Sequence, residues 1–165
     1  MKKAVFSGVT AVAAVLLVST SAFAQAASAN ASIAVTANVN AKAKLTLGTA
    51  SITFADADPD TTPTMTATAF NIDVKARASG ATTLTVLASG DLTAAGGTIP
   101  IASLTWTATG SGFQNGTSNK TTAQTVGSWA ASGSPSGTQT FSLPNSWTYA
   151  TGTYTVTLNY TLTAP

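Results

Sequence analysis

The sequence predicts an all-β protein, and three observations carry that prediction. Thr, Ala, Ser, Gly and Val dominate from residue 25 onward, and the β-branched residues among them favour strands. Short runs of alternating apolar and polar residues are interrupted by Gly, Asn and Pro at close intervals, as in sandwiches and barrels. No long stretch combines helical spacing with helix caps. We therefore expect one domain over 25–165, a two-sheet immunoglobulin-like sandwich of about seven to nine mostly antiparallel strands.

The first 24 residues have the pattern of a signal peptide. Lys2 and Lys3 precede an uncharged apolar run over 4–18, and residues 22–24 (Ala-Phe-Ala) supply the small residues that signal peptidase recognises. The run is too short to span a bilayer comfortably, and no second apolar run follows it. We expect cleavage before Gln25 and an extracellular, cell-surface or periplasmic protein without a membrane span after cleavage. An uncleaved membrane anchor is the alternative.

The expected strands follow from the alternation. In the last of them, over 153–163, five apolar side chains share one face while threonines and Asn159 share the other. Upstream, the apolar phase changes near Ala69, which predicts a bulge or bend there. In chain order, the expected strands lie at 33–39, 45–47, 52–54, 65–69, 70–77, 83–88, 99–107, 139–143 and 153–163.

Charge and composition limit the functions open to this chain. The formal charge of +2 comes from Lys2 and Lys3, so five cations balance five aspartates after the leader, and no nucleic-acid partner is indicated. Histidine and cysteine are absent, and the sequence contains no glutamate. Nucleophilic triads and zinc sites need such groups, so we expect no enzyme and no cofactor. Asp73 and Asp91 are the only acids outside an acidic loop, which leaves a hydrolase as a distant third class.

Three smaller patterns are candidate sites. Asp56, Asp58 and Asp60 alternate like the start of a calcium loop, but the loop glycine and a closing glutamate are missing, so a solvated turn is the favoured interpretation. Lys42 and Lys44 alternate on an expected strand, where they either contact an anionic polymer or protect a sheet edge from aggregation. An aromatic surface for glycans or a protein partner is the third candidate, with core or rim packing as its alternative. Its residues are Trp129, Trp147 and Tyr149.

The C-terminal stretch 152–165, GTYTVTLNYTLTAP, resembles the last strand of the WxL-domain proteins of bacterial cell surfaces. In that family a Trp-x-Leu motif lies near the chain end, and Tyr160 takes the place of its Trp here. Residues 83–86 fall where the family's other motif would be, again without Trp. This resemblance implies non-covalent attachment to a cell wall or partnership with other surface proteins.

The segment 33–39, IAVTANV, resembles the N-terminal donor segment of the cysteine-free fimbrial pilins of the chaperone–usher type. Residues 99–106 resemble a mid-chain segment of these pilins, and the Thr- and Val-rich last strand fits as well. The resemblance implies a sandwich that lacks one strand and is completed by the N-terminal segment of the next subunit. The alternative is that this segment is the domain's own first strand. The side chains that would insert are Ile33, Val35, Ala37 and Val39.

Both resemblances imply a non-catalytic role outside the cytoplasm. We therefore expect a structural and interaction protein of the cell surface, which assembles with copies of itself like a fimbrial subunit. A monomeric cell-wall- or glycan-binding module of the WxL kind is the alternative. The expected partners are other copies of the chain, surface proteins or polysaccharide.

Overall fold

The computed structural model describes residues 29–165, so the expected signal peptide over 1–24 lies outside the described residues. The chain divides into a unit that ends at Ala37 and a second unit from Asn38 to Pro165. Residues 29–41 contain no helix or strand. Residues 29–165 contain no helix with the length and hydrophobicity that a membrane-spanning helix requires.

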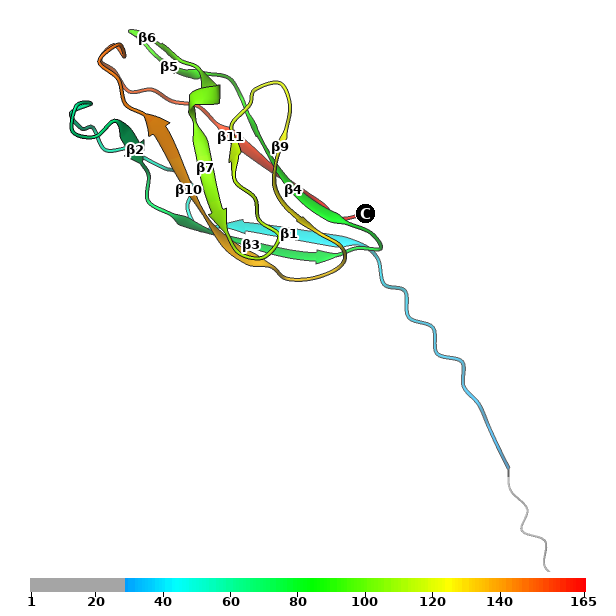
Figure 1. Cartoon of the computed structure of the whole chain (residues 1–165). Coiled ribbons are helices and arrows are strands. Elements are labelled where there is room, and N and C mark those ends of the chain that lie inside the picture. The colour runs from blue at the N-terminus through cyan, green and yellow to red at the C-terminus, as the bar shows by residue number, and fades with distance from the viewer. Residues whose placement is uncertain (1–28) are drawn as a thin grey trace, which may run out of the picture. The chain divides into compact units, whose positions relative to one another are not determined.

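The second unit is an all-β sandwich of two antiparallel sheets and a short hairpin (Figure 1). The larger sheet has the order β1–β3–β10–β7–β8, with β2 also paired to β10, and the smaller has the order β11–β4–β9. Strands β5 and β6 form the hairpin. The bounds are β1 Lys42–Leu47, β2 Thr64–Thr66, β3 Phe70–Arg77, β4 Thr82–Ala88, β5 Leu92–Ala94, β6 Gly97–Ile99, β7 Thr105–Thr109, β8 Gly116–Thr117, β9 Gln124–Trp129, β10 Ser136–Pro144 and β11 Leu158–Thr163.

The core lies between the two sheets and follows from the alternation of side chains. Along β3, buried and exposed residues alternate from Phe70 to Lys75, and the inward positions of β4 are all buried. Trp106 and Phe141 meet with ring centroids 6.0 Å apart, and Phe70 stacks on Phe141 at 6.2 Å. The Trp106 indole N–H donates to the Gln114 carbonyl at 2.9 Å, so this buried polar group is satisfied. The all-β prediction is therefore confirmed.

The predicted irregularity near Ala69 is present as a bulge. Thr66 pairs with Ser142 and Phe70 pairs with Gln139, so four residue steps on one side oppose three on the other. The extra residue lies in the 67–69 segment, where the Ala67 N–H still donates to the Phe141 carbonyl at 2.9 Å. This geometry explains why the apolar phase of the sequence changes at this place.

Other strand predictions were wrong in detail. Residues 52–54 form no strand; Ile52 and Phe54 instead pack on the core from an irregular connection. Pro100 interrupts the run predicted over 99–107, and a 3-10 turn (η1, Ile101–Ser103) separates β6 from β7. The last strand begins only at Leu158. Within 29–165 there are eleven strands, more than the expected seven to nine, because β5, β8 and β9 lie where no strand was predicted.

Gly116 permits the close approach of β8 to the core tryptophan. A Cβ atom at this position would fall against the six-membered ring of Trp106. We expect Gly116→Ala to lower the free energy of unfolding by about 1–3 kcal/mol, because the indole or β8 must move. Urea denaturation followed by tryptophan fluorescence measures this loss.

Gly90→Ala is the matched control, because a Cβ atom there has no neighbour within 4 Å. Its stability should stay within about 0.5 kcal/mol of the parent. Equal losses in the two variants would contradict the packing argument.

Candidate interaction surfaces

The segment that resembles a donor strand is exposed. Ile33 and Val35 are 90% and 88% accessible, and Val39 is 67% accessible. Ala37 is exposed as well, and none of these residues belongs to a strand. The first strand of the sandwich is β1, which begins at Lys42. Residues 33–39 are therefore not the domain's own first strand in this structure.

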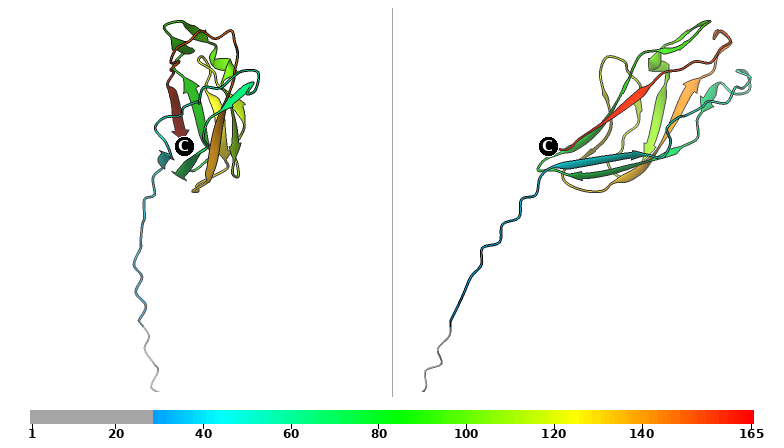
Figure 2. Two further views of the ribbon diagram at one scale, coloured as in Figure 1. Left: turned by 90° about the vertical axis from the view of Figure 1, so that its left-hand side faces the viewer. Right: turned by 180° about the vertical axis from the view of Figure 1, so that it is seen from behind.

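Strands β1 and β11 are the edges of the two sheets and lie beside each other at one margin of the sandwich (Figure 2). In the described part of the chain, β1 pairs only with β3 and β11 pairs only with β4. Their inward side chains stand opposite fully buried residues of β3 and β4 but are only half-buried themselves. We call these side chains the β1–β11 seam; they are Leu45, Leu47, Leu158, Tyr160 and Leu162.

Tyr160 ties the seam to the opposite sheet. Its hydroxyl donates to the side-chain oxygen of Gln139, a fully buried residue of β10, at 2.6 Å. The Gln139 side-chain nitrogen has no hydrogen-bond partner among the described residues. Burial raises the pKa of the Tyr160 phenol well above its usual range, an effect that the hydrogen bond to Gln139 only partly offsets.

Removal of the Tyr160 hydroxyl should therefore destabilise the domain. Tyr160→Phe leaves the whole Gln139 amide unpaired in the core, and we expect a loss of about 1–3 kcal/mol in urea denaturation at pH 8. Replacing Gln139 by Leu in the same chain should recover part of the loss, because no buried amide then remains. A fully stable Tyr160→Phe variant would contradict this assignment.

The raised pKa also sets the response to alkaline pH. Above about pH 10 the phenol ionises in the unfolded chain but not in the folded one, so the unfolded state binds fewer protons. Stability should fall with rising pH by up to about 1.4 kcal/mol per unit from this group. Denaturation curves between pH 9 and 11 should lose this component in Tyr160→Phe. Equal slopes in both proteins would contradict it.

The outer face of β1 and β3 carries an unusual arrangement of charge. Lys42 stands directly opposite Arg77, and Lys44 stands directly opposite Lys75. All four side chains are exposed on the solvent face of the larger sheet, and we call them the cationic strip. Like charges at directly opposed positions destabilise a sheet, by an amount similar to the roughly 0.2–1 kcal/mol that a favourable pair contributes. The sequence suggested the two lysines of β1 but not their partners on β3.

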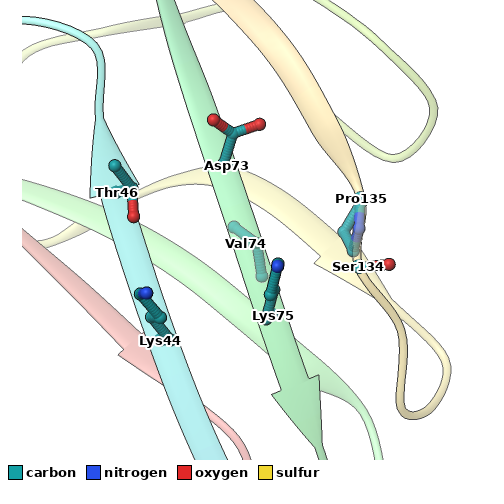
Figure 3. A pocket seen from close by; sticks show the side chains of 7 residues that line it. All are labelled: Lys44, Thr46, Asp73, Val74, Lys75, Ser134 and Pro135. Carbon is teal, nitrogen blue, oxygen red and sulfur yellow. The ribbon is translucent and has the colours of Figure 1, made fainter.

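An open depression lies beside the strip (Figure 3). Lys44 and Lys75 line it from neighbouring strands, with Thr46 and Asp73 further along the same pair of strands. Ser134 contributes from the connection that precedes β10. The depression therefore combines two ammonium groups with hydroxyl groups and one carboxylate.

The three aromatic candidates do not form one surface. Trp129 is half-buried, packs edge-on against Phe113 at 5.0 Å, and donates its indole N–H to the Ser111 carbonyl at 2.8 Å. Tyr149 packs on the core. Trp147 is 70% accessible, and its indole N–H donates to an Asp60 carboxylate oxygen at 3.1 Å. Trp129 lies before the start of the nine-residue strand β10, and Trp147 lies after its end. The two indoles are therefore separated by about the length of this strand, on the order of 30 Å.

The acidic loop is arranged as a turn. The Asp58 carboxylate accepts the Asp60 backbone N–H at 2.9 Å, and the Asp58 carbonyl accepts the Thr62 N–H at 2.8 Å. Asn145 braces the loop through its amide, which donates to the Ala57 carbonyl at 2.9 Å. Within residues 29–165, no group of three or more His, Cys, Asp or Glu side chains is placed to hold a metal ion.

The two remaining acids differ in their surroundings. Asp91 accepts hydrogen bonds from the Lys120 ammonium at 2.6 Å and from the Ile101 N–H at 2.9 Å. The Lys120 hydrogen bond is the main reason why the pKa of the Asp91 carboxyl lies below its usual value. Asp91 thus joins three connections of the fold, whereas Asp73 lies on the solvent face of β3 beside the cationic strip.

No family model, no curated protein and no solved structure matches this chain.

Proposed function

We propose that this protein is an exported structural and interaction subunit of the cell surface, which assembles by lending residues 33–39 as a strand to a second copy. The observation that carries the proposal is the pairing of an exposed, alternating apolar segment with a half-open seam in the same chain. The apolar side chains of the segment are exposed to solvent, and the apolar side chains of the seam are only half-buried.

The complementarity is that of β-augmentation. The free edges of β1 and β11 offer unpaired backbone groups to an extended peptide. An added strand would place alternate residues inward, so that Ile33, Val35 and Val39 could cover the half-buried leucines of the seam. Burying a Val or Ile side chain contributes about 1.5–3 kcal/mol, so a few such residues suffice for stable association.

A second copy is a better recipient than the chain's own seam. Only Asn40 and Ala41 separate Val39 from β1. To lie antiparallel beside its own β1, the segment would need a two-residue hairpin at these positions, with positive φ at one or both. Ala disfavours that conformation, and no residue other than glycine has positive φ in the described part of the chain.

Substitutions on the two faces of the segment test the proposal. Val35→Asp places a charge on the face that would insert, and we expect at least about a ten-fold loss of self-association, because an unpaired charge is costly to bury. Thr36→Asp adds the same charge on the opposite face and should assemble normally. Sedimentation velocity and electron microscopy measure assembly. A monomeric parent protein, or equal behaviour of the two variants, would contradict the proposal.

Deletion of 25–40 gives a complementary experiment. The truncated chain keeps every strand of the sandwich, so it should fold but remain monomeric. A synthetic peptide of residues 30–41 should then bind it and raise its melting temperature in a concentration-dependent way. No shift at millimolar peptide would count against the seam as the acceptor.

The wall-binding module is the second candidate, and Trp147 favours it. An exposed indole that is held in place by Asp60 is suited to stack on a sugar ring. In this case the purified monomer should sediment with cell walls, and Trp147→Ala should abolish that binding while Trp129→Phe retains it. Self-assembly without binding to cell walls would contradict the wall-binding function and support the assembling subunit.

A further inference from the structure

The cationic strip concentrates nearly all the free positive charge of the described chain. Residues 29–165 contain five cations, and four of them are in the strip. The fifth, Lys120, is 2.6 Å from Asp91, and this is the one ion pair within 29–165. From residue 25 onward the aspartates balance the cations in number. The cations without an ion pair within 29–165 nevertheless lie together on one sheet face.

Protection of a sheet edge does not explain this arrangement. Lys42 and Lys44 lie on the edge strand β1, where lysines commonly prevent aggregation. Lys75 and Arg77 lie on β3, which pairs with β1 along one side. On the other side, β10 pairs only with Phe70–Asp73, and the connection before β10 accepts the N–H groups of Val74 and Ala76. Charges on an internal strand block no edge, and here they face other cations directly. An external anion would relieve that repulsion.

The shape of the site suits an extended polymer of anions. The four cations form two rungs, about 5 Å wide between strands and about 7 Å apart along them. The outward positions of β1 and β3 include no aromatic side chain on which a nucleobase could stack. Thr46 and Ser134 instead offer hydroxyl groups in the adjoining depression, which suit the hydroxyl groups of a sugar.

We propose that the strip binds an acidic polysaccharide, with the carboxylates of successive uronate residues paired to Lys42, Lys44, Lys75 and Arg77. Asp73 is the next outward residue of β3 after Lys75, so the positive charge on this strand ends there. The strip includes no residue of the segment 33–39 or of the seam. Polysaccharide binding can therefore be tested independently of self-assembly.

Binding of polygalacturonate to the purified full chain, by isothermal titration calorimetry at low salt, is the direct test. We expect binding that weakens strongly at 0.5 M NaCl, because exposed ion pairs are screened. Lys75→Gln should weaken it about 1.5- to 5-fold, and the fourfold Gln variant should bind no polymer. Lys75→Arg should retain binding.

Lys120→Gln is the matched control, because it removes the same charge away from the strip and should leave the affinity unchanged. The melting temperature of Lys75→Gln should be no lower than that of the parent, since a like-charge pair is lost. The proposal is overturned if polygalacturonate does not bind, or if Lys120→Gln weakens binding as much as Lys75→Gln. Equally tight, strip-dependent binding of DNA or of phosphatidylglycerol vesicles would also overturn it.

Discussion

The structure depends on the burial of one apolar layer between two antiparallel sheets. The chain has no cysteine, so no disulfide shares this task. Trp106 and Phe141 pack at the centre, with Ile72 and Leu84 almost wholly inaccessible on either side. The inner, apolar face of each sheet has to pack against another layer, so apolar surface stays exposed wherever this packing ends.

The cover ends along β1 and β11. On the neighbouring strands β3 and β4, the side chains opposite the seam are buried, whereas those of the two edge strands remain half-exposed. A sandwich with a partly open margin has apolar surface and free backbone groups in the same place. The same chain also contains an exposed alternating segment, and the strand donation that we propose would account for both features.

Charge is distributed as unevenly as apolar surface. Four of the five positive side chains within 29–165 lie on the outer face of β1 and β3, while Asp56, Asp58 and Asp60 lie together in the loop before β2. A balanced overall charge therefore conceals local fields that can attract or orient a partner. The functional chemistry proposed for this protein is surface recognition by strand edges and ammonium groups, which needs none of the proton-transfer groups that the sequence lacks.

The sequence alone determined the all-β class, the inward face of most strands, the bulge near Ala69 and the absence of His, Cys and Glu. These are local properties, because the period-two pattern and the composition are contained within each segment. Only the tertiary structure decided that Lys44 faces Lys75, that Trp129 and Trp147 lie far apart, and that residues 52–54 pack without pairing. Register joins segments distant along the chain, and it is selected by how the whole core packs rather than by any one strand.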